Sequence, residues 1–361
     1  MRIGFDARMI THPGIGRYIK SLLPEMIRQA GGDEFVIFGD QKELVNIAGA
    51  GNARIVEWNA PIYSLQEQVF LPYRGKKLDI LHVPHFNVPV SYRGKMVVTI
   101  HDLIYLLFPG AGRFGLAKHY AGFMAGKALE KADKIITVSK HTEKDLLGMY
   151  GGQYAGKVEV IHEAADRMFR QITDKTRSAD VQCRHRLSDR IILYVGSIKA
   201  HKNVQTLLKV FTLLKKWGAP HQLVICGRWD KKQDMLKAEM IDSGIRYLGE
   251  VSTDDLIVLY NIADVLVHLS FYEGFGLTAL EAMQCGTPVI VSDSSSLPEV
   301  AGEAACSVSP HNVEQIADTV YNVLVNAHLR EGMIERGLKH VKQFSWEETA
   351  RRTLEVYRKV C

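Results

Sequence analysis

The sequence lacks the features of a secreted or membrane-spanning protein. Its 361 residues include only five cysteines, none in a Cys-x-x-Cys pair, which argues against a zinc site and for a reducing compartment. No run approaches ~18 uncharged apolar residues, the length that a transmembrane helix needs. Asp6 and Arg8 stand where a secretion signal would need its apolar core. We therefore expect a cytoplasmic protein and leave open a peripheral contact with the inner face of the membrane.

The composition also lacks a strong bias of charge or polarity. Hydrophobic residues make up 47% of the chain and charged residues 24%, as in a globular protein. The net charge of +5 is mildly basic, which suits an anionic ligand without identifying one. No basic stripe with interleaved aromatic residues occurs, so no nucleic-acid partner is expected. The length exceeds that of one ordinary core and predicts two domains.

Apolar, β-branched runs alternate with helical patterns along most of the chain, which is typical of α/β folds with doubly wound parallel sheets. The predicted strands of the first half are Arg2–Ala7, Glu34–Gly39, Ile80–Val83, Met96–Ile100, Lys134–Val138 and Val158–Ile161. Those of the second half are Ile191–Val195, Gln222–Cys226, Ile245–Leu248, Val265–Leu269, Pro288–Ser292 and Ala305–Val308. Predicted helices include Phe114–Lys131, Lys140–Tyr150 and Leu277–Gln284. The polar segment Asp166–Arg190 has no such pattern and is interpreted as a linker.

The most informative stretch combines a strand, a glycine-rich loop at Glu273–Gly276 and a helix. In open α/β sheets, ligands bind beyond the carboxyl ends of the strands, where this loop is expected. The N–H groups of a helix N-terminus there favour an anion, above all phosphate. Glu273 and Glu281 are each suited to accept paired hydrogen bonds from a sugar diol. Alternatively, Glu273 only complements the positive helix end and Glu281 is only solvated.

Three further features carry weaker signals. Lys202 precedes the helix that begins at Val204, and a cation is misplaced at a helix N-terminus unless an anion lies between them. Gly14 and Gly16 lie in the first strand-to-helix loop, where such a pair usually marks a tight turn. His101 directly follows a predicted strand, and a histidine there is more often a satisfied structural group than a ligand.

The residues from Glu273 to Ile290, followed by Ser296-Leu-Pro-Glu-Val, resemble the Glu-x7-Glu signature of the retaining glycosyltransferase family 4. The resemblance implies the GT-B fold, in which two Rossmann-like domains face each other across a cleft. Residues 1–166 would form the acceptor domain and residues 167–343 the nucleotide-sugar domain, with a last helix in 344–361 crossing back to the first domain.

The resemblance also implies roles for single residues. The implied catalytic residues are His101, Glu273 and Lys202. The implied donor-binding residues are Gly14, Gly16, Ser197, Lys202, Arg228, Val251, Glu273, Phe275, Gly276, Leu277 and Glu281. In that family the second glutamate holds the ribose, the first contacts the transferred sugar, the lysine clamps the diphosphate, and the histidine lies beside the sugar. Ser197 stands where many members have an arginine, so Arg228 is either a substitute phosphate ligand or an exposed loop cation.

The implied activity is transfer of a hexose from a nucleotide-sugar to an acceptor hydroxyl with retention of configuration. The sequence Gly14-Ile-Gly-Arg-Tyr looks most like the mannosyltransferase branch, which favours GDP-mannose and a glycan or lipid-linked acceptor. A UDP-hexose donor is the alternative, as is a non-catalytic protein that binds nucleotide-sugars or glycans. Because no Asp-x-Asp occurs, neither a divalent metal nor a cofactor is expected. The base and the acceptor are not readable from the sequence.

Overall fold

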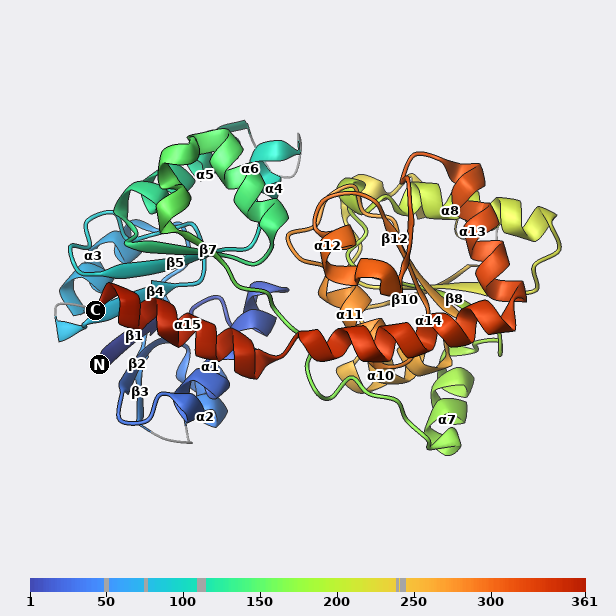
Figure 1. Cartoon of the computed structure of the whole chain (residues 1–361), viewed down its shortest axis with the longest axis horizontal. Helices are drawn as coiled ribbons and strands as arrows, with labels where there is room; N and C mark the ends of the chain where they lie inside the picture. Colours follow the sequence, from blue (N-terminus) through green and yellow to red (C-terminus); the bar gives the residue numbers. More distant parts are fainter. Residues whose placement is uncertain (49–51, 75–76, 109–114, 238–239, 241–244) are drawn as a thin grey trace. The chain divides into compact units, whose positions relative to one another are not determined.

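The computed structural model describes residues 1–48, 52–74, 77–108, 115–237, 240 and 245–361, which form two compact units (Figure 1). Unit 1 comprises Met1–Glu163 and Phe344–Cys361, and unit 2 comprises Ala164–Gln343. Each unit contains a parallel sheet with helices, so the predicted pair of doubly wound α/β domains is confirmed.

The sheet of unit 1 has the strand order β3-β2-β1-β4-β5-β6-β7. Its strands are β1 (Arg2–Asp6), β2 (Glu34–Gly39), β3 (Ala53–Glu57), β4 (Ile80–Val83), β5 (Met96–Ile100), β6 (Lys134–Thr137) and β7 (Val158–Val160). Every residue of β4 and β5 is buried, because helices cover both faces of a parallel sheet. The loops that follow β1, β4 and β5 therefore open at one carboxyl edge.

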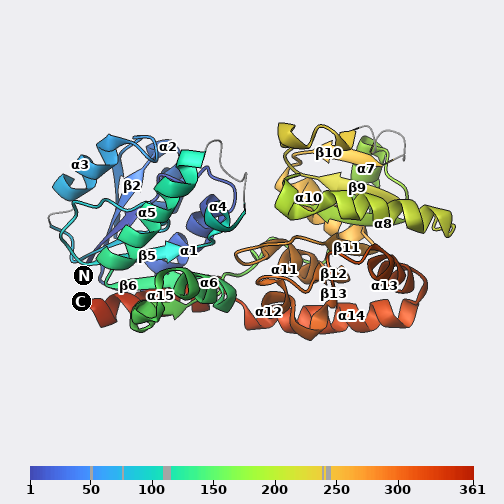
Figure 2. The same ribbon diagram turned by 90° about the horizontal axis from the view of Figure 1, so that it is seen from above.

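The helices of unit 1 are α1 (Ile15–Gln29), α2 (Gln41–Ala48), α3 (Leu65–Arg74), α4 (Ile104–Leu107), α5 (Gly115–Lys131), α6 (Lys140–Tyr150), the 3₁₀ turn η2 (Gly152–Lys157) and α15 (Trp346–Val360). Helix α15 lies beside α1 in both views (Figure 1 and Figure 2). The Gln29 side chain donates a hydrogen bond to the Glu347 carbonyl at 3.0 Å. Trp346, Leu354 and Tyr357 are buried in this contact, so the predicted return of the last helix to the first domain is confirmed.

The sheet of unit 2 has the order β10-β9-β8-β11-β12-β13. Its strands are β8 (Ile191–Val195), β9 (Gln222–Cys226), β10 (Arg246–Gly249), β11 (Val265–His268), β12 (Val289–Ser292) and β13 (Cys306–Val308). Its helices are α7 (Lys175–His185), α8 (Val204–Lys216), α10 (Thr253–Ile262), α11 (Leu277–Gln284), α12 (Leu297–Ala301), α13 (Val313–Val325) and α14 (Ala327–His340), with short 3₁₀ turns η3 (Ala200–Lys202), η4 (Lys231–Gln233), η5 (Gly302–Ala304) and η6 (Val341–Gln343).

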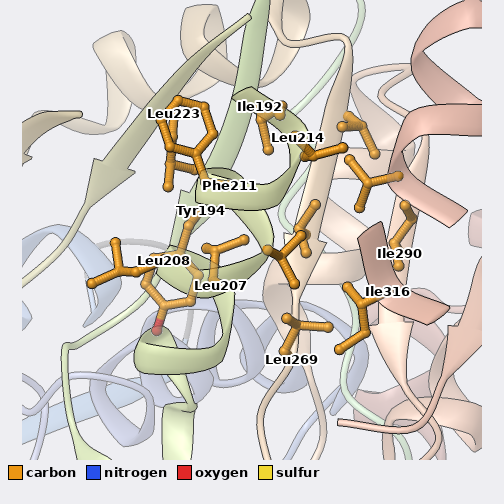
Figure 3. Close-up of a cluster of buried hydrophobic side chains, with 14 of the residues drawn as sticks. Ile192, Tyr194, Leu207, Leu208, Phe211, Leu214, Leu223, Leu269, Ile290 and Ile316 are labelled. Atoms are coloured by element: carbon orange, nitrogen blue, oxygen red, sulfur yellow. The ribbon is translucent and has the colours of Figure 1, made fainter. Parts of the chain in front are cut away.

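The core of unit 2 fixes the strands from which the candidate site is built. Leu207, Leu208 and Phe211 of α8 pack against Ile192 and Tyr194 of β8 (Figure 3). Truncating a buried phenylalanine of this kind to alanine typically costs about 3–5 kcal/mol of folding free energy. Because β8 and β11 are paired neighbours, this packing holds the loops that follow them at the same sheet edge.

The segment interpreted as a linker is not patternless. It contains α7, which buries only Val181 and therefore gives no apolar periodicity. Charged contacts hold it instead, since Arg177 and Arg184 pair with Asp254 and Asp255 of α10 at 3.0 and 2.8 Å.

The edge strand β3 was not predicted from the sequence, because its residues are partly or fully exposed. Phe114, the predicted first residue of the helix that became α5, lies outside the described residues.

None of the helices that the structure describes is long and apolar enough to span a membrane.

Candidate functional site

Lys202 and Glu273 meet at the carboxyl edge of the unit 2 sheet. Lys202 follows β8 and Glu273 follows β11, and these strands are neighbours. The Lys202 ammonium group donates to both carboxylate oxygens of Glu273, at 2.6 and 2.7 Å. Their side chains are only 17% and 13% exposed, so solvent screens this ion pair little. The structure thus joins two predicted site residues that the sequence had assigned to different parts of one ligand.

His268 completes this group and was missed in the sequence. It ends β11, and its Nε2 lies 2.7 Å from Glu273 Oε1. Burial alone would raise the pKa of Glu273, but Lys202 and His268 outweigh it and hold that pKa well below its usual range. Glu273 is therefore ionised at neutral pH. One signal was available, because a histidine at the end of an apolar strand run points to the ligand edge of the sheet.

Hydrogen bonds from the Ser295–Ser296 segment fix the loop between Glu273 and α11. The Glu273 N–H donates to Ser295 Oγ at 2.9 Å, and Ser296 Oγ donates to the Phe275 carbonyl at 2.7 Å. Gly276 has φ +114°, and a Cβ there would lie 2.8 Å from a Leu297 methyl group. Only glycine fits this position, and α11 begins at the next residue, Leu277. The helix N-terminus is thus held beside the ion pair.

Glu281 lies in the second turn of α11 and is buried, with 1% of its surface exposed. Tyr260 donates a hydrogen bond to its Oε2 at 3.0 Å. The alternative that Glu281 is only solvated is therefore wrong. Its contact with a ribose stays a prediction.

Two glycine-containing loops of unit 2, which follow β8 and β9, cross each other. A Cβ on Gly227 would lie 2.0 Å from the Gly196 carbonyl oxygen, so the crossing needs glycine. The Ile198 N–H donates to the Arg228 carbonyl at 2.9 Å, which brings the backbones of Arg228 and Ser197 together. The Arg228 side chain is exposed. The structure therefore leaves both interpretations of this cation open.

Val251 is half-buried and precedes Ser252, the N-cap of α10. Ser252 Oγ accepts a hydrogen bond from the Asp255 N–H at 3.1 Å, which caps this helix. The donor-binding role implied for Val251 stays a prediction.

In unit 1, Gly14 and Gly16 of the region after β1 favour glycine for different reasons. Gly14 caps α1 with φ +82°, and a Cβ there would meet nothing within 4 Å, so its backbone angle rather than crowding favours glycine. A Cβ on Gly16 would lie 2.2 Å from the Ile10 carbonyl oxygen, and the Gly16 N–H donates to the His12 carbonyl at 2.7 Å. The tight turn accounts for Gly16, whose N–H is already engaged.

His101 follows β5 and is only partly satisfied. Its Nδ1 lies 3.0 Å from Glu163 Oε1, and its ring meets the Tyr18 ring edge-on at 4.8 Å. Its Nε2 is buried and has no hydrogen-bond partner among the described residues. Because Glu163 orients the ring through Nδ1, a neutral His101 presents Nε2 as an acceptor. Glu163 gave no motif in the sequence.

Across the described residues, no group of three or more histidine, cysteine, aspartate or glutamate side chains is placed to hold a metal ion. The Lys202–Glu273–His268 group combines a cation, a carboxylate and an imidazole, and the N-terminus of α11 that follows it favours an anion.

Comparison with known proteins extends this description. Residues 14–167 match the family described as Glycosyltransferase Family 4, and residues 177–340 match Glycosyl transferases group 1. O-antigen chain mannosyltransferase B of Escherichia coli is 28% identical over 99% of this chain and 100% of its own. An uncharacterized glycosyltransferase of Methanocaldococcus jannaschii is 32% identical over 96% of this chain and 94% of its own.

Solved structures show the same fold at low identity. Anabaena HepE in complex with UDP-glucose has a TM-score of 0.79 at 15% identity, covering 99% of this chain and 100% of that one. Sucrose-phosphate synthase from Thermosynechococcus elongatus has a TM-score of 0.78 at 20% identity, covering 99% and 98%. With both halves matched, the chain belongs to the GT-B glycosyltransferases of family 4.

Proposed function

We propose that this glycosyltransferase is a retaining mannosyltransferase that uses GDP-mannose, needs no divalent metal, and transfers mannose to a hydroxyl group of a glycan or lipid-linked saccharide. The observation that carries the proposal is the partly buried Lys202–Glu273 pair beside the N-terminus of α11. Mannose is favoured because a relative that matches the whole chain is named a mannosyltransferase.

The charges at this edge suit a departing diphosphate. In the reaction, the bond between the anomeric carbon and the phosphate oxygen breaks, and a bond to the acceptor oxygen forms on the same face of the sugar. The acceptor proton passes to the leaving phosphate oxygen, so no side chain has to act as a base. Lys202 and the first N–H groups of α11 would stabilise the negative charge that grows on the diphosphate. A metal ion is then not needed for this task.

Glu273 does not prevent Lys202 from binding phosphate. An ammonium group has three donors, and two of them bind Glu273, which leaves one for a phosphate oxygen. Glu273 thus orients the cation and keeps lone pairs for a hydroxyl of the transferred sugar. In unit 1, the His101 Nε2, which has no hydrogen-bond partner among the described residues, is suited to accept a hydrogen bond from a hydroxyl group.

The test is a panel of GDP, UDP, ADP and their mannose and glucose conjugates. A ligand at about a hundred times its Kd raises the free energy of unfolding by ~2.7 kcal/mol, which thermal unfolding detects. We expect GDP-mannose to stabilise the protein most and to be turned over, with a product that keeps the anomeric configuration by NMR. Lys202→Ala should lose this response, whereas Lys199→Ala, an exposed lysine of the same loop, should keep it.

Other outcomes separate the alternatives. Stabilisation and turnover with UDP-glucose but not with GDP-mannose would replace the donor assignment. Binding without turnover for every donor and acceptor would instead favour a non-catalytic nucleotide-sugar-binding protein. A product of inverted configuration would reject the retaining mechanism.

A further inference from the structure

A second polar cluster lies at the carboxyl edge of the unit 1 sheet, outside the residues used so far. Arg8, which follows β1, donates to both oxygens of Asp6 at 2.9 and 2.7 Å and to Glu67 of α3 at 3.1 Å. Its guanidinium carbon lies 3.7 Å from the centre of the Trp58 ring. The three charged side chains are 2–5% exposed. Two carboxylates therefore compensate the charge of Arg8.

A pocket beside Arg8 has room for about one water-sized group. Its polar lining residues are Asp6, Arg8, His85 and Asn87, and its apolar ones are Met9, Ile62, Val83 and Pro84. The Asn87 N–H donates to His85 Nδ1 at 3.1 Å, so the proton of neutral His85 lies on Nε2. Burial, followed by the positive charge that His101, His12 and Arg8 carry when protonated, lowers the pKa of His85 to about 3. The pocket thus offers neutral and carboxylate groups but no uncompensated cation.

The hydroxyl groups of two tyrosines contact polar residues that line this pocket. The Tyr120 hydroxyl donates to Asn87 Oδ1 at 2.7 Å, and the Tyr63 hydroxyl lies 3.4 Å from His85 Nε2. The rings meet edge-on with centroids 5.6 Å apart. Tyr63 nevertheless remains 50% exposed and Tyr120 39% exposed. Large aromatic faces with anchored polar tips are typical of ligand-contacting residues.

Tyr63 also occupies an unusual backbone conformation. Its φ is +68°, which is rare for a bulky residue and costs about 1–3 kcal/mol relative to an ordinary conformation. A glycine at this position would avoid the strain. Backbone strain of this kind concentrates at functional sites, which favours a role for the Tyr63 side chain beyond packing.

We propose that Tyr63 and Tyr120 bind a sugar ring of the acceptor, that one hydroxyl of this sugar enters the pocket beside Arg8, and that the sugar carries no charge. The C–H face of a pyranose packs on the aromatic rings, and its hydroxyl replaces a water-sized group among Asp6, His85 and Asn87. A phosphate or carboxylate is disfavoured, since the two carboxylates of Asp6 and Glu67 outnumber the single charge of Arg8 and repel an anion.

The position suits an acceptor. His85 follows β4 and His101 follows β5, and these strands are neighbours in the sheet. A sugar bound at Tyr63 and Tyr120 therefore lies near a residue proposed for the transfer reaction. Its identification as the acceptor rests on the proposed function, whereas its binding here does not.

The test is binding of simple sugars to the full chain without a donor. Saturation-transfer NMR with methyl α-mannoside, methyl α-glucoside and methyl α-galactoside, each at millimolar concentration, compares neutral rings with mannose 6-phosphate. We expect at least one neutral glycoside to bind, and mannose 6-phosphate to bind about tenfold more weakly. Tyr63→Ala and Tyr120→Ala should each weaken the neutral glycoside by about tenfold, a loss of ~1.4 kcal/mol.

A matched control is Phe123→Ala, which removes another exposed aromatic ring of α5 that is 58% exposed. It should bind the glycoside like the wild type, and thermal unfolding of each variant verifies that the fold is intact. Tyr63→Phe keeps the ring and should retain most of the binding. The proposal is overturned by wild-type affinity in both alanine variants, by preference for the phosphorylated sugar, or by no signal from any neutral glycoside.

The two proposals fail separately. If GDP-mannose is not a donor, glycoside binding and its loss in Tyr63→Ala still stand. If mannose is transferred from GDP-mannose but the acceptor KM is unchanged in Tyr63→Ala and Tyr120→Ala, the acceptor site is wrong while the donor assignment survives.

Discussion

The variant Lys202→Ala tests whether one cation serves both the fold and the reaction. In the structure Lys202 donates two hydrogen bonds to Glu273, which is 13% exposed. The variant leaves the side chain of this carboxylate with His268 as its remaining partner from β11. Breaking a buried ion pair by removing one partner costs about 3–5 kcal/mol, and the partial exposure of both side chains places this pair near ~3 kcal/mol.

We expect Lys202→Ala to lower both the melting temperature and kcat. For a domain of about 150–250 residues, 1 kcal/mol shifts Tm by roughly 2–4 °C, so the variant should melt roughly 6–12 °C lower. Loss of a preorganised group facing the leaving diphosphate raises the barrier by ~3 kcal/mol, which lowers kcat about 100-fold. Differential scanning calorimetry and steady-state release of the nucleotide diphosphate measure these two quantities.

Two further variants separate stability from catalysis. Lys199→Ala removes an exposed lysine of the same loop and should change the free energy of unfolding by less than about 0.5 kcal/mol. The double variant Lys202→Met/Glu273→Gln removes both charges and should recover most of the stability but not kcat. The reasoning is refuted if Lys202→Ala matches the wild type in both assays, or if Lys199→Ala loses as much activity.

Three other perturbations probe the same description. Activity should survive excess EDTA in a turnover assay, and loss that only Mg²⁺ or Mn²⁺ restores would reject the metal-free proposal. Glu281→Gln should raise the donor KM more than it lowers kcat, because a ribose contact is equal in ground and transition states; unchanged kinetics would remove Glu281 from the site. The lowered pKa of Glu273 stabilises the fold fully above its ordinary value of 4.5, and this contribution is lost as pH falls towards the folded value. Urea midpoints should therefore fall more steeply below that pH in the wild type than in Glu273→Gln, and parallel profiles would contradict the shift.

The local signals in the sequence were sufficient for most elements. The helix Leu277–Gln284 was predicted with its observed bounds, because Gly276 and Gly286 flank an apolar helical stripe. By contrast, α7 and β3 gave no signal, since charged contacts to another helix hold the first and the second is a partly exposed edge strand. A periodic apolar pattern predicts elements that bury a whole face, and neither α7 nor β3 does so.

The candidate site shows a different limit. The sequence marked Lys202 and Glu273 separately, because each lies in a loop after a strand. Their contact joins residues 71 positions apart and depends on the strand order, in which β8 and β11 are neighbours. The partners His268 and Glu163 carry no motif of their own. Only the position of His268 at the end of an apolar strand run hinted at its place, and its contact with Glu273 is seen only in the folded structure.

The position of α15 in the sequence constrains how the protein folds during synthesis. Unit 1 contains the first residues of the chain, yet it buries Leu354 and Tyr357 from a helix that follows all of unit 2. Domains generally fold as they emerge from the ribosome, at about 5–20 residues per second. Here all of unit 2 is translated before α15 is made. The apolar surface of α1 that α15 covers therefore stays uncovered during that time. Unit 1 is thus made first but can complete its fold only after the last helix of the chain has been made.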